Sequence, residues 1–297
     1  MTGYRYPFRL RAPLGSWRPL DGLVAAYALL TLPVLALGIV RGQPCRGQAA
    51  LSLAVLAGLA LLIRRSQNTR SRFWTLLRLA YAPLLYFVFY HQIQTLWPIL
   101  RSAPLDAHLA ALEQRLWGLQ PSLAFQPALP SRWLSELFCG AYFAYYLFVP
   151  LVGFTALLTR GYAAAERILV ATTCCFFACY TLFWLAPTVG PHFWFPPATG
   201  PRLYDGYVFN HLLFFFTSGG EIRGGAFPSS HIAVAVLLTL LARRSTPALF
   251  PFLALVTLLI LPGVVYLHAH YLLDVPAGLL VGWLAYRLTP ERRDPIG

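Results

Sequence analysis

Two histidines and one aspartate stand where apolar helices are expected to begin. His231 ends the stretch GAFPSSH, just before a long apolar run, and His270 opens the stretch HYLLD, which ends at Asp274. Because His270 and Asp274 are four residues apart, a helix would place them on one face, with the aspartate leaning toward the histidine. A carboxylate behind an imidazole fixes its tautomer and stabilises the imidazolium formed when the other nitrogen reacts. These three residues are the predicted catalytic set.

The spacing of the two histidines along the chain predicts that they meet in space. The 39 residues from His231 to His270 would rise about 58 Å in a helix, close to two crossings of a hydrocarbon core of about 30 Å. The segment 243–247, RRSTP, lies part-way, where a cytoplasmic turn belongs. We therefore expect the chain to descend from His231, turn, and return so that both histidines face each other at the outer surface.

The residues before His231 suit an anion. A serine of the Pro-Ser-Ser-His stretch is a good N-cap, and a helix start offers free backbone N–H groups at the positive end of its dipole. Glycines in the same segment let the backbone approach a ligand closely, and arginines of the outer loop supply forked donors to phosphate oxygens. The candidate phosphate-binding residues are Arg223, Arg202, Ser229, Ser230, Gly225 and His192.

Composition places these residues in a membrane protein. Of the 297 residues, 58% are hydrophobic and 11% are charged, too few charges to cover a soluble domain of this length. We predict an all-α, polytopic integral membrane bundle with about eight transmembrane helices, within a range of six to eight. The long apolar runs lie at about 22–40, 49–63, 79–100, 133–158, 168–187, 226–242, 247–267 and 270–288.

The arginines predict the orientation of this bundle. All 23 basic residues are arginine, and with eight spans and a cytoplasmic N-terminus fifteen fall on the inner side against seven on the outer side. Inner loops carry such an excess. We therefore expect both termini in the cytoplasm and the site on the periplasmic, extracytoplasmic or luminal face, as in a bacterial inner membrane protein. The same distribution, in short clusters between apolar runs, disfavours nucleic acid as a partner despite the net charge of +13.

The chain is predicted to form one membrane domain over residues 1–297. Residues 1–100 hold N-terminal helices, 101–132 an outer interfacial segment, and 133–289 the catalytic core, with an active-site loop at 188–230. Within 101–132 the leucines recur at helical spacing, which predicts an amphipathic helix at the outer face, packed as a lid on the ends of the spans. These leucines are Leu105, Leu109, Leu112 and Leu116. Three cysteines inside the apolar run 168–187 are expected to act as small hydrophobic residues, not as metal ligands.

GAFPSSH followed by HYLLD resembles the second and third signature motifs of the type 2 phosphatidic acid phosphatase superfamily. The resemblance covers residues 224–278 strongly and 104–225 more weakly, through LDAHLAALEQRLWG and APTVGP. Two positions depart from the family pattern. Its first motif, KxxxxxxRP, cannot occur without lysine, and Val264 stands where the third motif has arginine. The inositol phosphorylceramide synthase branch tolerates both absences, and its motifs are similar to GAFPSSH and VYLHAHYLLDVPAG here.

The resemblance implies a membrane phosphotransferase that moves a phosphorylated headgroup from a phospholipid or lipid phosphate to a lipid hydroxyl. It implies that His270 attacks phosphorus and becomes phosphohistidine, that Asp274 orients it, and that His231 protonates the leaving alcohol and then deprotonates the acceptor. With water as acceptor the enzyme would instead be a lipid phosphate phosphatase acting on a phosphatidic acid, sphingolipid or polyprenyl phosphate. No cofactor or metal is implied. We assign Arg223 and Arg202 in place of the missing cations.

Two functions from other classes stay open. His231, His270 and Asp274 could ligate zinc, since HxxxD is compatible with a site of two histidines and one carboxylate, although the glutamate of HExxH is lacking. Intramembrane polar residues can also mark a transporter, but transporters tend to place them near the midplane in broken helices. Here the ionisable residues lie at helix mouths on one side. His268, two residues from His270, is expected to have a structural role.

Overall fold

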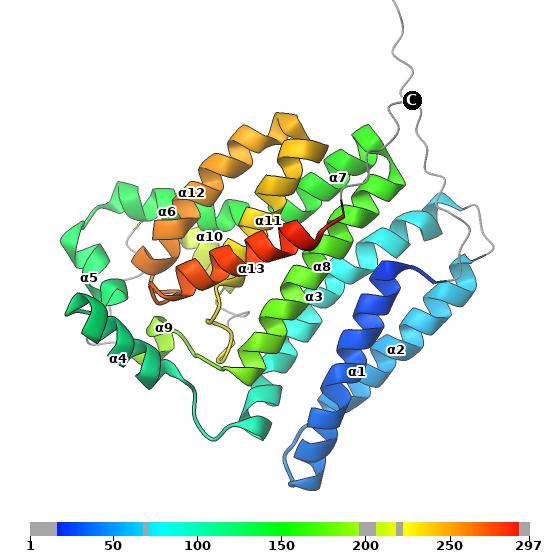
Figure 1. The fold of residues 1–297 in the computed structure, drawn as a ribbon, viewed down its shortest axis with the longest axis horizontal. Helices are drawn as coiled ribbons and strands as arrows, with labels where there is room; N and C mark the ends of the chain where they lie inside the picture. Colours follow the sequence, from blue (N-terminus) through cyan, green and yellow to red (C-terminus); the bar gives the residue numbers. More distant parts are fainter. Residues whose placement is uncertain (1–16, 68–70, 196–205, 218–221, 291–297) are drawn as a thin grey trace, which may run out of the picture.

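The computed structural model describes residues 17–67, 71–195, 206–217 and 222–290. Within these ranges every regular element is a helix, which confirms the predicted all-α class (Figure 1). In chain order the helices are α1 (Pro19–Val40), α2 (Arg46–Ser66), α3 (Arg72–Leu100), α4 (Asp106–Trp117), α5 (Pro121–Ala128), α6 (Arg132–Tyr145), α7 (Phe148–Arg160), α8 (Tyr162–Leu185), α9 (Pro191–Trp194), α10 (Val208–Thr217), α11 (Ser230–Ser245), the 3₁₀ turn η1 (Pro247–Leu249), α12 (Phe250–Tyr266) and α13 (Asp274–Leu288).

Five of the described helical segments are long and apolar enough to cross a bilayer: α1, α2, α3, α8 and η1 with α12. The pair α6 and α7 makes a sixth if it is counted as one span, bent by 48° where the helices meet. These segments agree with a polytopic membrane protein, but the predicted count of eight is not confirmed. The helices α11 and α13 have only 16 and 15 residues. Their rise of about 24 and 22 Å is less than a hydrocarbon core of about 30 Å.

Two prolines explain why α11 and α13 begin later than the apolar runs at 226 and 270. Phe227 precedes Pro228, and a residue before proline is pushed away from helical backbone angles, so α11 begins only at Ser230. Pro276 lies in the first turn of α13. A proline is tolerated there, but it would break a helix that continued further back, because its ring clashes with the carbonyl four residues earlier. The four or so residues before each helix are left to form turns around the site.

Aromatic packing on α8 forms the centre of the bundle. Tyr27 of α1 stacks on Phe177 of α8 with ring centroids 4.3 Å apart, and Phe89 of α3 meets the same ring edge-on at 5.4 Å. A buried ion pair between Asp21 and Arg78 also joins α1 to α3. In Figure 1, α1 and α2 lie together on one side of α3 and α8, while α11, α12 and α13 lie on the other. The N-terminal helices therefore support a core made by the later part of the chain.

Two glycines let α13 cross α11 closely. A Cβ atom added at Gly278 would lie 2.6 Å from the carbonyl oxygen of Ser229, and one at Gly282 would overlap the backbone of Ala233. Small residues at a helix crossing allow the backbones to approach within van der Waals contact. The same crossing is reinforced by a hydrogen bond from the Ser229 N–H to the Asp274 carbonyl oxygen, 3.3 Å long. The first residues of the two helices are thereby held side by side.

The outer segment 101–132 contains two short helices, α4 and α5, which lie near the start of α13 (Figure 1). The leucine stripe predicted for α4 is exposed at its end, with 43% of Leu112 and 57% of Leu116 accessible. The buried side of the helix is acidic instead, because Asp106 and Glu113 are both fully buried. These two residues are seven apart and so share one helical face. The outer helix α4, predicted to be a lid, therefore packs on the protein through its carboxylate side chains and leaves Leu112 and Leu116 exposed.

Candidate active site

His231 and His270 lie next to each other, as the spacing predicts. Their ring centroids are 5.8 Å apart and the ring planes are inclined by 66°. His231 is the second residue of α11, and His270 follows the end of α12 in the turn that leads to α13. The chain therefore passes down α11 and back up α12, which brings both imidazoles to the same end of the helical hairpin.

Asp274 contacts His270, but the two residues do not share a helix as predicted. His270 lies in the turn before α13, and Asp274 is the first residue of that helix. The Nδ1 atom of His270 is 3.0 Å from Oδ2 of Asp274, and the backbone N–H of Tyr271 donates to the same oxygen at 3.0 Å. Both side chains are almost completely buried. Because Nδ1 is held by the carboxylate, Nε2 of His270 is the nitrogen left for chemistry.

Three tyrosines from the end of α6 surround His231, and sequence reasoning did not identify them. The ring of Tyr142 lies 4.4 Å from the His231 ring, that of Tyr145 lies 4.7 Å away, and that of Tyr146 lies 6.2 Å away. The Tyr142 hydroxyl is 3.4 Å from Nδ1 of His231. The run AYFAYY was the available signal, since aromatic rings with a polar tip are suited to a boundary between an apolar body and a polar site.

The loop before α11 is paired with the segment that follows α8. The carbonyl oxygen of Thr188 accepts a hydrogen bond from the Ala226 N–H at 3.1 Å, and its hydroxyl oxygen accepts one from the Phe227 N–H at 2.7 Å. Thr188 is itself buried. This residue therefore fixes the backbone that leads into Pro228, Ser229 and His231.

The serines predicted to bind phosphate lie at the start of α11, and the glycine lies in the loop that leads into it. Ser229 is its N-cap, as predicted, because its hydroxyl oxygen accepts from the Ile232 N–H at 3.4 Å. This bond and complete burial commit Ser229 to the helix start. Ser230 is the first helical residue, beside His231. Gly225 is half-buried, and a Cβ atom there would lie 3.3 Å from side-chain atoms of Ile222 and Tyr90. The role of these residues in phosphate binding stays a prediction.

Two of the basic residues predicted to contact phosphate, Arg223 and His192, lie in or near α9. The guanidinium of the exposed Arg223 lies 5.5 Å from the ring centroid of Phe193, and the Arg223 carbonyl accepts from the indole N–H of Trp97 at 3.0 Å. The exposed His192 donates its backbone N–H to the carbonyl oxygen of His268 at 3.1 Å. The α9 turn is thus joined to the loop that carries His270 through His192, and the Arg223 guanidinium lies over its Phe193 ring. Arg202 lies outside the described residues.

His268 has the structural contacts expected of it. Its backbone is left-handed, with φ of 57°, and its buried Nε2 atom lies 3.3 Å from Oε1 of Gln126 in α5. Burial, together with the nearby His192, lowers the pKa of His268 to about 4. The imidazole is therefore neutral at neutral pH and links the turn before α13 to the outer segment.

The two buried carboxylates of α4 contact both loops of the site and were also missed from sequence. The Asp106 carboxylate accepts from the backbone N–H groups of Val189 at 2.8 Å and Gly190 at 2.9 Å, and from the Tyr271 hydroxyl at 3.0 Å. Glu113 accepts from the Leu273 N–H at 3.0 Å. Burial raises the pKa of both carboxyl groups, while these hydrogen bonds act in the opposite direction.

The described residues do not support the zinc alternative. Among them, no group of three or more histidine, cysteine, aspartate or glutamate side chains is placed to hold one metal ion. His231, His270 and Asp274 therefore do not converge as a set of ligands. Instead the carboxylate contacts one imidazole directly, and the second imidazole faces the first.

An apolar groove runs from His231 along the bundle. It has a volume of about 810 Å³ and is lined by α3, the end of α6, α7 and α8. Ser230, His231 and the three tyrosines lie at one end, while Leu76 of α3 and Leu157 of α7 lie at the other. Two residues of its α3 wall, Leu84 and Phe87, are more than 60% exposed, so the groove is open sideways. Its lining is suited to a hydrocarbon chain rather than to a polar ligand.

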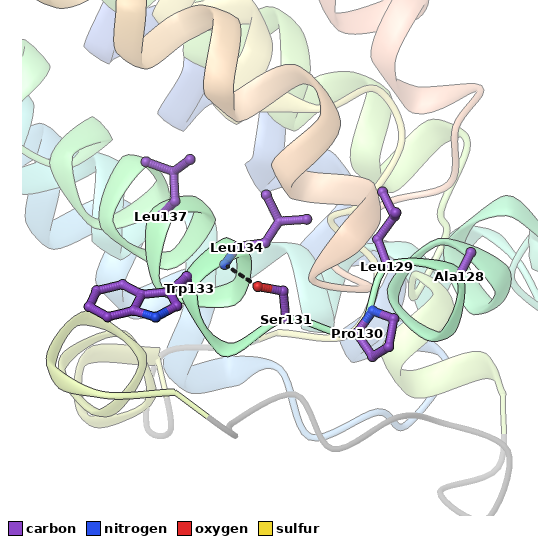
Figure 2. Close-up of a pocket in the computed structure, with 7 residues that line it drawn as sticks. All are labelled: Ala128, Leu129, Pro130, Ser131, Trp133, Leu134 and Leu137. Carbon is purple, nitrogen blue, oxygen red and sulfur yellow. Dashed lines mark hydrogen bonds between the residues drawn. The ribbon is translucent and has the colours of Figure 1, made fainter.

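A second hollow of about 590 Å³ lies where α5 meets α6 (Figure 2). The Ser131 hydroxyl there accepts from the Leu134 N–H at 3.3 Å, which caps α6. Among the described residues, no ionisable side chain lines the hollow, so they supply no acid or base for a reaction there. It is lined by Ala128, Leu129, Pro130, Ser131, Trp133, Leu134 and Leu137.

Comparison with known proteins agrees with this geometry. A family model described as the PAP2 superfamily matches residues 107–288. Among curated proteins and among solved structures, no significant match was found. The matched range contains His231, His270 and Asp274 and the loops that bring them together. Because it covers more than half of the 297 residues, the chain belongs to the PAP2 superfamily, whose members are phosphatases and phosphotransferases that act on lipid phosphates.

Proposed function

We propose that this enzyme transfers a phosphorylated headgroup from a phospholipid to a lipid hydroxyl through a phosphohistidine, as inositol phosphorylceramide synthases do. The observation that carries the proposal is the position of His231, which faces His270 on one side and lines the apolar groove on the other. The family resemblance implies that the histidine of the second motif, here His231, activates the acceptor. An acceptor that reaches His231 through an apolar groove is more readily a lipid alcohol than water.

The first step forms a bond between Nε2 of His270 and phosphorus. The bond from phosphorus to the oxygen of the donor alcohol breaks, and a protonated His231 gives that oxygen its proton. Asp274 holds Nδ1 of His270 and stabilises the positive charge that develops on the ring. The rings of His231 and His270, 5.8 Å apart, are suitably spaced to contact one phosphoryl group between them.

The second step reverses these roles. The acceptor hydroxyl gives its proton to His231 and attacks phosphorus, and the bond from phosphorus to Nε2 of His270 breaks, which restores both histidines. Backbone N–H groups at the start of α11 and the guanidinium of Arg223 are the proposed contacts for the phosphate oxygens. We keep Arg202, Ser229, Ser230, Gly225 and His192 in this proposed set.

The dimensions of the groove support a lipid as substrate. Along α3 its lining extends from Leu76 to Tyr90, about 21 Å of helix, which is more than half of a hydrocarbon core of about 30 Å. A chain lying in it would place its headgroup at His231. Hydrolysis of a lipid phosphate by the same two histidines is the alternative, and it differs only in the acceptor.

Products distinguish the two reactions. The purified protein would be placed in liposomes with ³²P-labelled phosphatidylinositol and either ceramide or a diacylglycerol whose acyl chains differ in length from those of the donor, so that the product of transfer differs from the donor. We expect a new labelled phosphodiester lipid that depends on the acceptor, and none from His270→Gln. Labelled phosphate or inositol phosphate as the sole product would favour hydrolysis. Unchanged turnover by His270→Gln would remove both forms of the proposal.

The excess of arginine in alternate loops supports an orientation with both termini in the cytoplasm and the histidines at the outer, periplasmic face of a bacterial inner membrane. Fusion of alkaline phosphatase, which is active only outside the cytoplasm, to each terminus tests this directly. Both fusions should be inactive. An active fusion at either end would contradict the proposed orientation without affecting the chemistry.

A further inference from the structure

We infer that Asp106 of α4 is a positioning residue that sets the separation of His231 and His270. It holds the turn that carries His270 and the segment after α8, which is paired with the loop that leads to His231. It lies outside the two histidine motifs, in the stretch LDAHLAALEQRLWG that carries the weaker part of the family resemblance. The inference rests on the membership of the PAP2 superfamily and on hydrogen bonds of the described residues, and it applies to transfer and hydrolysis alike.

The first half of the connection leads to His231. Asp106 accepts from the N–H groups of Val189 and Gly190 through different oxygens, Oδ2 and Oδ1. The adjacent Thr188 binds the Ala226 and Phe227 N–H groups in turn. The segment after α8 is therefore a bridge, with the carboxylate on one side and the backbone leading into α11 on the other.

The second half of the connection leads to His270. Oδ1 of Asp106 also accepts from the hydroxyl of Tyr271, the residue that directly follows His270. The Tyr271 N–H donates to Asp274, so this residue links the α4 carboxylate to the carboxylate that orients His270. Glu113 lies seven residues further along α4, on the same helical face. It accepts from the Leu273 N–H and so holds the same turn. One helix thus contacts the turn that carries His270 directly and the loop that leads to His231 through the segment after α8.

A carboxylate is required at this position because three donors converge on it. An asparagine has one acceptor oxygen, and its NH₂ group would face one of the three donors, so at least one hydrogen bond would be lost. Ionising a carboxylate that is fully buried also costs free energy, which is reflected in the raised pKa of Asp106. Asparagine removes that cost, so it should weaken the connection without unfolding the protein.

The expected effect is on turnover rather than on substrate binding. Misplacement of reacting groups by about 1 Å can lower a rate about 100-fold, whereas the apolar groove that holds the lipid chain does not include α4. A residue with only a structural role would lower the amount of folded enzyme and leave the turnover of each folded molecule unchanged.

The test compares Asp106→Asn with the wild-type enzyme in detergent micelles, with dioctanoyl phosphatidic acid as substrate and phosphate release as readout. We expect kcat to fall about 10- to 100-fold, KM to stay within about two-fold, and the thermal midpoint to be unchanged or higher. His108→Gln, on the exposed side of the same helix, is the matched control and should behave as wild type. If the wild type forms only phosphodiester products, the transfer assay replaces phosphate release.

Tyr271→Phe provides an independent test, because it removes only the hydroxyl that joins Asp106 to the His270 turn. It should lower kcat by a smaller factor, and the double variant should lose less than the product of the two single effects, since both act through one connection. Wild-type kcat in both single variants, or losses that match the unfolded fraction, would overturn the inference. If Asp106→Asn fails to fold, the result for Tyr271→Phe decides alone.

Discussion

At the scale of single residues, Asp274 decides which nitrogen of His270 can react. Its Oδ2 lies 3.0 Å from Nδ1, so the reactive tautomer is set by one contact. Asp274→Asn keeps the size of the side chain but removes the charge that stabilises an imidazolium. We expect kcat to fall by about 100-fold or more, with little change in KM. Steady-state kinetics on a lipid phosphate measure this, and retention of wild-type kcat would show that the carboxylate does not orient the nucleophile.

His268 predicts a dependence of stability on pH. Its pKa is about 4 in the folded protein because the ring is buried near His192, against about 6.5 when unfolded. The unfolded chain therefore binds a proton more readily, so folded stability should fall as the pH drops from about 6.5 to about 4, by on the order of 3 kcal/mol.

His268→Asn should remove that dependence, because asparagine does not titrate and tolerates the left-handed backbone at this position. Thermal midpoints of the wild type and variant, measured in detergent between pH 4 and 7, should converge at the acidic end. The exposed His108→Gln serves as control. Parallel curves for wild type and His268→Asn would contradict a buried neutral imidazole.

The reacting residues could be identified from the sequence, but the residues that hold them could not. His231, His270 and Asp274 stand out because ionisable groups at the mouths of apolar helices are costly and therefore have a function. Tyr142 contacts a residue 89 positions away, and Asp106 contacts one 165 positions away. Only the tertiary packing decides which side of α4 or α6 faces the site. For α4, the leucine periodicity indicates that the leucine side packs on the protein, whereas the acidic side is buried.

At the scale of helices, the crossing of α11 and α13 determines how near the two motifs lie. Gly282→Ala would place a methyl group against the backbone of Ala233, which cannot give way as a flexible side chain can. We expect a loss of about 1–3 kcal/mol in stability and a clear decrease in kcat as the helices separate.

Gly58→Ala in α2 is the matched control for that change. No atom lies within 4 Å of the added methyl group there, so the variant should be neutral or slightly more stable because alanine favours helix. Thermal midpoints and kcat of both variants are the measurements. Equal behaviour of the two would mean that the close approach of α11 and α13 is not needed.

The helices themselves were predictable, whereas their first residues were less so. All eight apolar runs contain helix, because hydrophobic length is a strong signal in a membrane protein. The serine N-cap predicts the start of α11 correctly, although the apolar run begins four residues earlier, whereas a start of α13 at His270 is four residues too early. The apolar character continues through the turn that carries His270. Pro276 was the available signal for the later start of α13, because a proline restricts where a helix can begin, and Pro228 supports the start of α11 in the same way.

At the scale of the whole molecule, the groove connects three parts of the chain and ends at His231, which faces His270. The N-terminal half supplies the α3 wall, the later helices supply the α7 and α8 walls, and α11 supplies His231 at the end. If a lipid chain occupies the groove, then filling its middle should affect long-chain substrates more than short-chain ones, because a short chain does not extend past His231 to that depth.

Gly153 of α7 is the position to fill, since it lines the groove and the nearest atom to an added Cβ is 3.9 Å away. We expect Gly153→Phe to raise KM about tenfold or more for phosphatidic acid with sixteen-carbon chains, a loss of about 1.4 kcal/mol or more in binding. For eight-carbon chains KM should stay within about two-fold. Gly58→Phe, on an open face of α2, should leave both unchanged. Equal losses for both chain lengths in Gly153→Phe would mean that the groove does not hold the substrate, while the chemistry of His231 and His270 would still stand.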